Sequence, residues 1–155
     1  MKQQMTTQQV EIAIAKHFKP RVNLVVPNVS WGMGISYECD IVVLTKSGYA
    51  YEIEIKVSRG DLVKDGKKRH QHNDGRFRYL WFAVPMSLLK HIEFIPARAG
   101  ILGVTSKGRV HVLANPVINQ HAPRWSDWDR YKLARLGCLR IWPLKEKIFQ
   151  KAGKK

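Results

Sequence analysis

The sequence has few of the features that stabilise secreted or membrane-bound proteins. Its 155 residues include only two cysteines, Cys39 and Cys138, with no CxxC pair or other metal-ligand spacing. A disulfide framework is therefore not expected, and a reducing compartment fits the chain. No apolar run approaches the roughly 20 residues that cross a bilayer, and the N-terminus lacks the apolar segment of a signal peptide. We expect a cytoplasmic protein without a membrane partner.

Acidic residues are also scarce in this chain. Only 12 Asp and Glu stand against 27 Lys and Arg, which gives a formal net charge of +15. The length suits one ordinary domain with a real core. In a domain of this size, such an excess of positive charge indicates a polyanionic partner, nucleic acid before a membrane surface. A basic protein that binds no nucleic acid is the alternative.

Residues 38–65 carry the clearest structural pattern in the sequence. Two apolar runs, at 41–44 and 49–57, are separated by a short Lys-Ser-Gly turn at 46–48. Strand-forming runs joined by so short a turn predict a β-hairpin. The rest of the chain is interpreted around this hairpin.

The second strand of the predicted hairpin alternates in polarity. Glu52, Glu54 and Lys56 point to one face, and the apolar residues between them point to the other. Asp40 opens the first strand, so pairing across the hairpin could bring it to the same sheet edge as Glu54 and Lys56. An exposed sheet face lined with Glu and Lys is a common alternative for this pattern.

Two carboxylates beside an ammonium group suit metal-dependent cleavage of a phosphodiester bond. A hard cation such as Mg²⁺ removes the repulsion between the carboxylates, takes oxygen ligands and keeps waters that a phosphate can displace. It also polarises a phosphoryl oxygen and lowers the pKa of a bound water, which can attack the phosphorus in line. Lys56 could orient that water or neutralise the charge that develops on the phosphorane.

The remaining segments predict one mixed sheet flanked by helices. A helix capped by Thr6 or Thr7 runs to about Phe18 and precedes a strand at 22–27. The elements expected after the hairpin are a helix from 59, a buried strand at 79–84, a short helix at 86–92, and a second hairpin of strands 101–105 and 110–113. The resulting order is α-β-β-β-α-β-α-β-β. A hairpin followed by a helical crossover implies at least one parallel strand pair.

Basic residues gather directly after the hairpin. Residues 56–78 contain eight Lys and Arg against three Asp, a local balance of +5. A basic helix that leaves the site could follow a phosphate backbone without reading base sequence, although a solvated helix face is the alternative. His70 and His72 lack a third metal ligand, so we expect surface or phosphate contacts for both. The residues assigned to nucleic-acid contact are Arg59, Lys64, Lys67, Lys68, Arg69, His70 and Gln71.

The chain closes with a basic, aromatic-rich extension at 120–155, which follows a domain at 1–119. Ser126 caps a helix that we expect Gly137 to end. From residue 121 onward, ten Lys and Arg stand against three acidic residues, and aromatic residues lie among them. These aromatics are Trp125, Trp128, Tyr131 and Trp142. They could stack on exposed bases or dock the extension onto the core, and Trp31 has the same two alternatives.

Several of these residues together resemble a known nuclease superfamily. Asp40, the run 54–56 and a helix-borne Glu11 are similar to the PD-(D/E)XK nucleases, and residues 38–115 most closely resemble the DNA-repair MmcB-like group. The similar stretches are ECDIVVL, EIEIKVSRGDLVKDGK, YLWFAVP, IPARAGILGV and VHVLANP, of which EIKVSRGDLVKD is the most specific. The chain departs from the motif at Cys39, where the motif has proline. The extension lies outside the resemblance.

The resemblance implies a fold, a cofactor and roles for individual residues. The fold would be restriction-endonuclease-like, with an αβββαβ core. Asp40, Glu54 and the backbone carbonyl of Ile55 would bind Mg²⁺ or Mn²⁺, Lys56 would assist catalysis, and Glu11 would take the acidic position of the first helix. The superfamily also includes inactive and purely binding members.

We therefore expect a metal-dependent DNA endonuclease of repair or recombination. The alternatives are a non-catalytic DNA-binding module of that machinery and an RNA-binding protein whose ExK run is accidental. Paired cuts in a DNA junction would ordinarily require a homodimer, and the sequence leaves that state open, along with the DNA structure that is preferred.

Overall fold

The chain folds around one mixed six-stranded β-sheet. The computed structural model describes residues 4–30 and 32–153, so the two alternatives for Trp31 lie outside the described residues. The elements in chain order are α1 (Thr7–His17), β1 (Leu24–Val29), β2 (Cys39–Leu44), β3 (Ala50–Ile55), α2 (Arg59–Asp65), β4 (Phe77–Pro85), the 3₁₀ helix η1 (Met86–Phe94), β5 (Gly100–Val104), β6 (Val110–Ala114) and α3 (Asp127–Ala152). The predicted order of elements is confirmed, although β1 begins at Leu24 rather than Val22.

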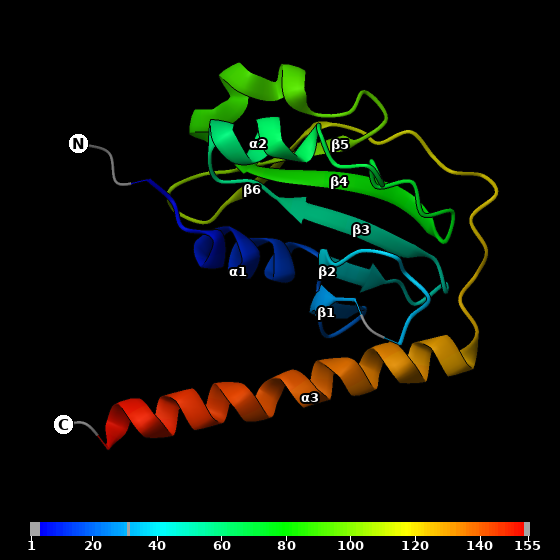
Figure 1. Cartoon of the computed structure of the whole chain (residues 1–155), viewed down its shortest axis with the longest axis vertical. Coiled ribbons are helices and arrows are strands. Elements are labelled where there is room, and N and C mark those ends of the chain that lie inside the picture. Colours follow the sequence, from blue (N-terminus) through cyan, green and yellow to red (C-terminus); the bar gives the residue numbers. More distant parts are fainter. Residues whose placement is uncertain (1–3, 31, 154–155) are drawn as a thin grey trace.

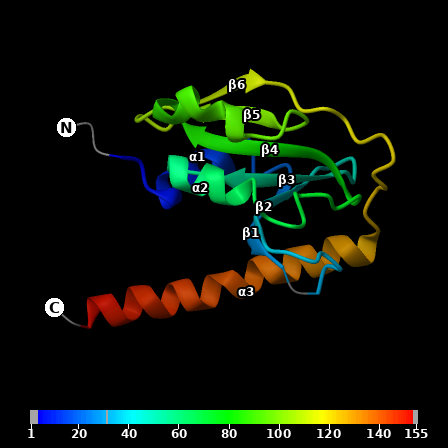
Figure 2. The ribbon, with the colours of Figure 1, turned by 45° about the horizontal axis from the view of Figure 1, so that its top comes forward.

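Figure 1 labels the strands of the sheet, and Figure 2 shows that they lie in it in the same order as in the chain. Strands β1 to β3 form an antiparallel meander, and β5 and β6 form an antiparallel hairpin. The pairs β3–β4 and β4–β5 are parallel, so each needs a crossover, which α2 and η1 provide. The mixed sheet with flanking helices is thus an α/β fold, as predicted.

Helices cover both faces of the sheet. Helix α1 packs its apolar stripe on one face, where Val10 and Ile14 join a cluster with Ile53. Thr6 caps this helix, and a reciprocal hydrogen-bond pair with Gln9 completes a capping box. Helix α2 and η1 lie over the opposite face, as Figures 1 and 2 show. The even-numbered residues of β3 point to that second face, beneath α2.

Helix α3 continues far beyond its expected end. We predicted termination at Gly137, but the helix runs from Asp127 to Ala152 through both Gly137 and Pro143. The reason is packing, because α3 lies along β1 and Gly137 faces Val26 so closely that a Cβ atom there would lie 3.3 Å from Val26 Cγ2. Glycine therefore serves close approach of the helix to the strand and not a helix end. The prediction from local sequence was wrong.

The aromatic residues of the extension divide between two environments. Trp125 is buried in the core beside Val26 and Leu44, and its indole N–H donates to the Arg76 carbonyl oxygen (3.1 Å). Trp128, Tyr131 and Trp142 are exposed on α3. Of these four aromatic residues, only Trp125 docks the extension onto the core. Among the residues that the structure describes, no helix combines the length and apolar character needed to span a bilayer.

We expect Trp125→Ala to lower the free energy of unfolding by about 3–4 kcal/mol, because it leaves a large cavity and removes a buried hydrogen bond. Trp125 is 5 % exposed, whereas Trp128 is 62 % exposed, so Trp128→Ala is a matched control expected to change stability by less than about 0.5 kcal/mol. Urea unfolding followed by circular dichroism measures both values. Equal losses in the two variants would contradict the assignment of Trp125 to the core.

Candidate metal centre

Glu52 and Glu54 of β3 and Lys56, the first residue after the strand, are buried together on the face that α2 covers. Glu52, Glu54 and Lys56 are 0 %, 1 % and 7 % exposed, so the alternative of an exposed face lined with Glu and Lys is wrong. Burial of carboxylates is costly unless each has a partner. Lys56 Nζ donates to Glu54 Oε2 at 2.8 Å and supplies one such partner.

Asp40 lies at the edge of this cluster, as the hairpin pattern predicted. Strands β2 and β3 are in a register that pairs Ile41 with Ile53, one position inward of Asp40 and Glu54. Asp40 Oδ2 accepts a 2.7 Å hydrogen bond from the backbone N–H of Ile55 and lies 3.8 Å from Lys56 Nζ. The ammonium group therefore lies near carboxylates of both strands.

Glu11 approaches the same edge from α1. Burial and the negative charge of Asp40 raise the pKa of Glu11 above its ordinary value. The predicted role of Glu11 in the site stays a prediction. The structure gives Glu11 no hydrogen bond to the other members of the cluster.

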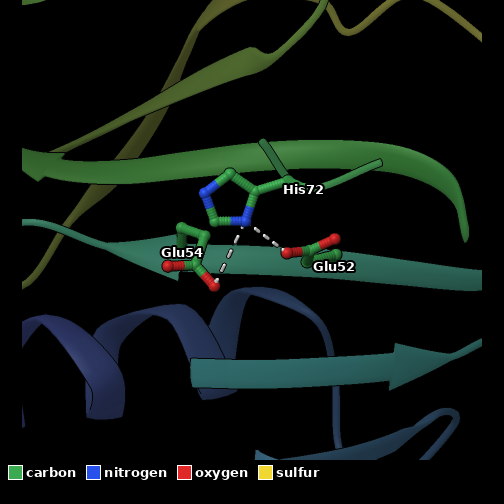
Figure 3. A group of neighbouring side chains, drawn as sticks. All are labelled: Glu52, Glu54 and His72. Atoms are coloured by element: carbon green, nitrogen blue, oxygen red, sulfur yellow. Dashed lines mark hydrogen bonds and ion pairs between the residues drawn. The ribbon is translucent and has the colours of Figure 1, made fainter. Parts of the chain in front are cut away.

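Two members of the buried network, Asp65 and His72, were not predicted from the sequence. Asp65, the last residue of α2, lies 3.1 Å from Lys56 Nζ and 2.9 Å from Lys68 Nζ through its Oδ1. Its Oδ2 lies 2.7 Å from His72 Nε2. We predicted surface or phosphate contacts for His72, but its side chain is buried over β3, beside Glu52 and Glu54 (Figure 3). That prediction was wrong.

His72 joins α2 to the carboxylates of β3. Its Nδ1 lies 2.6 Å from Glu52 Oε1 and 3.8 Å from Glu54 Oε1, as Figure 3 shows. Tyr37 donates from its hydroxyl to Glu52 Oε2 at 2.7 Å and stacks on the ring of His70. Glu54 Oε1 is buried and has no hydrogen-bond partner among the described residues.

The backbone around His72 is held in an unusual conformation. Gln71 and His72 are consecutive non-glycine residues with φ angles of 45° and 55°. Left-handed conformations are uncommon for such residues and persist where surrounding contacts fix them. The two hydrogen bonds of the His72 ring supply contacts of that kind. This segment therefore holds His72 over the carboxylates at a local conformational cost.

The basic segment differs in shape from the prediction. We expected a basic helix leaving the site, but α2 ends at Asp65, so only Arg59 and Lys64 of the assigned residues are helical. Lys67, Lys68, Arg69 and Gln71 are exposed in the turns that follow, and His70 is half-buried. The physical reason is the network itself, because Asp65 and His72 are both held inward and the chain must turn between them.

The electrostatics of the cluster favour positive charge. Burial and the charge of Asp40 raise the pKa of Glu54 to about 7. Burial alone would lower the pKa of Lys56, but the carboxylates of Glu54, Asp40 and Asp65 raise it above its ordinary value. Burial would likewise raise the pKa of Asp65, but hydrogen bonds with His72 and Lys68 lower it.

The Asp40–Glu54 edge has the donor chemistry for a hard divalent cation. Both residues offer carboxylate oxygens, the ligands that Mg²⁺ and Mn²⁺ prefer. Lys56 Nζ already places a positive charge 2.8 Å from Glu54 Oε2 and 3.8 Å from Asp40 Oδ2. For Ile55, the structure shows the backbone N–H bonded at this edge, and the predicted role of its carbonyl stays a prediction.

Because of this network, we expect the free energy of unfolding to fall as pH rises. Burial alone would lower the pKa of His72, but its hydrogen bonds with Asp65 and Glu52 raise it from 6.5 to about 9. The stabilisation that the protonated His72 ring provides is fully present below pH 6.5 and is lost as pH rises through about 9. We expect the free energy of unfolding in EDTA to fall by about 3 kcal/mol across this range, since one pKa unit corresponds to about 1.4 kcal/mol.

Urea unfolding at a series of pH values measures this fall. His72→Gln should remove most of it, whereas His70→Gln should retain it, because the His70 ring is not bonded to Asp65 or Glu52. A wild-type stability that stays constant or rises between pH 6.5 and about 9 would contradict the assigned role of the His72 proton.

Comparison with known proteins shows similarity of fold and gives no information about activity. No protein-family model and no curated protein matches this chain. Among solved structures, the chain is similar to a protein of unknown function from Silicibacter pomeroyi, with a TM-score of 0.66 and 18 % sequence identity. The match covers 96 % of this chain and 94 % of that one. At this identity, the similarity shows a shared α/β fold.

Proposed function

We propose that this protein is a metal-dependent DNA endonuclease that hydrolyses phosphodiester bonds in DNA repair or recombination. Its proposed cofactor is Mg²⁺ or Mn²⁺, held by Asp40 and Glu54. The proposal follows the resemblance to PD-(D/E)XK nucleases and their MmcB-like group. The order α1-β1-β2-β3-α2-β4 agrees with a restriction-endonuclease-like core at 1–119, and 120–155 would be its basic extension.

The observation that carries this proposal is the position of Lys56. Its buried ammonium group lies 2.8 Å from Glu54 and 3.8 Å from Asp40, which come from adjacent strands. A structural ion pair on a sheet face needs one carboxylate for one ammonium group. Here Lys56 has a further carboxylate neighbour in Asp40, whose side chain is one-third exposed, so a phosphate group would approach the cluster at Asp40.

The residues of the chain have distinct parts in the proposed reaction. A bound divalent cation would polarise the phosphoryl oxygen and lower the pKa of an attacking water. Asp40 is oriented for its role by the N–H of Ile55. The surrounding carboxylates raise the pKa of Lys56, and its proposed part is to orient the attacking water or to stabilise the negative charge that develops.

The exposed basic residues after α2 would hold the DNA backbone beside this edge. Lys67, Lys68 and Arg69 follow the helix end directly, next to the buried Asp65. Exposed cations of this kind contact phosphates and supply affinity that does not depend on base sequence. A non-catalytic DNA-binding module, or an RNA-binding protein, would use the same surface without needing Asp40.

Charge reversal tests this surface. Lys67→Glu/Arg69→Glu should weaken binding to a DNA duplex by about tenfold or more, because phosphate contacts are lost and repulsion is added. Arg21→Glu/Lys46→Glu is the matched control. Arg21 precedes β1 and Lys46 lies in the β2–β3 turn, so both exposed residues are at the opposite end of the strands from Lys56. Fluorescence anisotropy at constant salt compares the two. Equal losses of DNA affinity in the two double variants would show that the residues after α2 are not the binding surface.

Catalysis itself is tested on labelled duplex, nicked, flap, junction and single-stranded DNA with Mg²⁺, Mn²⁺ or EDTA. Metal-dependent cutting of at least one substrate is expected. Binding without any cutting would favour the non-catalytic module, and preference for RNA would favour the third alternative.

A further inference from the structure

The buried network has an inner side that the proposed nuclease reaction does not use. Glu52 and Glu54 come from β3, and His72 comes from the segment between α2 and β4, yet one atom of each side chain faces the other two (Figure 3). One ligand atom of each side chain lies within 4.8 Å of the other two. His72 Nδ1 lies 2.6 Å from Glu52 Oε1 and 3.8 Å from Glu54 Oε1. Two carboxylate oxygens and an imidazole nitrogen form a ligand set for a transition metal.

The outer polar atom of each of these side chains contacts a second residue, which holds the side chain in place. Tyr37 donates to the outer oxygen of Glu52 at 2.7 Å, and Lys56 donates to the outer oxygen of Glu54 at 2.8 Å. The outer nitrogen of His72 lies 2.7 Å from Asp65 Oδ2. Metal-ligating histidines commonly donate their other ring N–H to a carboxylate, which fixes the tautomer and the ring orientation.

An unsatisfied atom points to a missing ligand at this position. Glu54 Oε1 is buried, has no hydrogen-bond partner among the described residues and lies 3.8 Å from His72 Nδ1. A carboxylate oxygen buried without a partner costs free energy that a hydrogen bond or a cation would offset. The other two inner atoms, on Glu52 and His72, satisfy each other at 2.6 Å.

We propose that Glu52, Glu54 and His72 form a second metal site, which takes a divalent transition metal such as Zn²⁺ or Co²⁺. Metal–ligand distances near 2.1 Å in a tetrahedral site separate ligand atoms by roughly 3.4 Å. The observed separations of 2.6 and 3.8 Å from His72 Nδ1 lie on either side of that value, so small side-chain shifts are enough. Imidazole favours Zn²⁺ and Co²⁺ over Mg²⁺.

A cavity lies next to two of the three proposed ligands. This cavity of about 330 Å³ is bordered by Glu52 and His72 and further lined by polar residues that include Arg98 and Asn119. A fourth ligand, water or a substrate oxygen, could enter from this cavity.

This inference goes beyond the proposed nuclease function, although the two sites share Glu54. The nuclease edge uses Asp40 and an oxygen-only ligand set, whereas the inner site uses Glu52 and an imidazole. Either site could therefore exist without the other.

The test is a titration of the EDTA-treated full chain with Co²⁺, followed by visible absorption. We expect one equivalent to bind with the d–d absorption of a low-coordinate site, and Zn²⁺ but not Mg²⁺ to displace it. His72→Gln should weaken Co²⁺ affinity by about 100-fold or more, because it removes the imidazole ligand. His70→Gln should bind Co²⁺ like the wild type.

Two further outcomes separate this inference from the nuclease proposal. Normal Co²⁺ uptake by a protein that cuts no DNA would overturn the nuclease and leave the inner site standing. No Co²⁺ uptake by folded wild type, or uptake unchanged in His72→Gln, would overturn the inner site. If His72→Gln does not fold, imidazole ¹⁵N shifts of the wild type decide: Zn²⁺ must move His72 Nδ1, and shifts confined to the other histidines count against the site.

Discussion

Asp40→Asn is expected to lower the rate of DNA cleavage by about 10³-fold or more while DNA affinity and stability stay near those of the wild type. Asparagine keeps a side-chain oxygen that can accept the hydrogen bond from the Ile55 N–H, so the strand edge is preserved. It removes the negative charge that a divalent cation needs, and loss of metal-assisted stabilisation of several kcal/mol corresponds to three or more powers of ten in rate.

The matched control for this variant is Asp61→Asn. Asp61 lies in the first turn of α2 and is bonded through its backbone N–H to the Ser58 cap, outside the buried cluster. The same chemical change should leave cleavage within about twofold of the wild-type rate, because no reacting group is altered. Single-turnover cleavage and fluorescence anisotropy of the same DNA separate chemistry from binding. Loss of affinity in Asp40→Asn equal to its loss of rate would assign Asp40 to binding.

Lys56→Met should remove cleavage and also lower the free energy of unfolding by about 3–5 kcal/mol. Lys56 contacts Glu54, Asp65 and, more distantly, Asp40, and its loss leaves buried carboxylates without their cation. Breaking a buried ion pair from one side costs more than the pair itself contributes. Lys68→Met removes another lysine that contacts Asp65, but this side chain is 42 % exposed, so less than about 1 kcal/mol is expected.

A double variant distinguishes the two roles of Lys56. Lys56→Met/Glu54→Gln removes the ammonium group together with the charge of its nearest carboxylate, so part of the lost stability should return. Cleavage should not return, because both proposed catalytic groups are absent. Urea unfolding at pH 7 in EDTA gives the stabilities. A double variant as unstable as Lys56→Met alone would show that the Glu54–Lys56 pair is not the main interaction.

Most of the sheet could be predicted from local patterns. The alternation of Glu52, Glu54 and Lys56 with apolar residues, after a three-residue turn, specifies the β2–β3 hairpin and brings Asp40 near Lys56. The Ser126 cap also holds as predicted. These features depend on residues close in sequence, where side-chain period and capping chemistry decide the structure.

The predictions that failed depend on contacts between distant residues. Gly137 has the local signature of a helix end, but its close contact with Val26 of β1 makes it part of the helix. His72 lies in a polar, charged run and was expected at the surface. Its burial depends on Glu52, twenty residues earlier, and on Asp65, and no periodic pattern connects the three. Of these three residues, only Glu52 could be assigned to the cluster from the sequence, because the alternation of polar and apolar residues along the strand places it on the same face as Glu54.

The most direct test of the central claim is cleavage of the panel of labelled DNA structures by wild type and Asp40→Asn, purified in parallel. Each protein is first treated with EDTA, and excess Mg²⁺ is then restored. The account predicts no cutting in EDTA, recovery of cutting by wild type with Mg²⁺, and no recovery by Asp40→Asn. Equal cutting by both proteins, or cutting that persists in EDTA, would contradict a metal-dependent nuclease site at Asp40, Glu54 and Lys56.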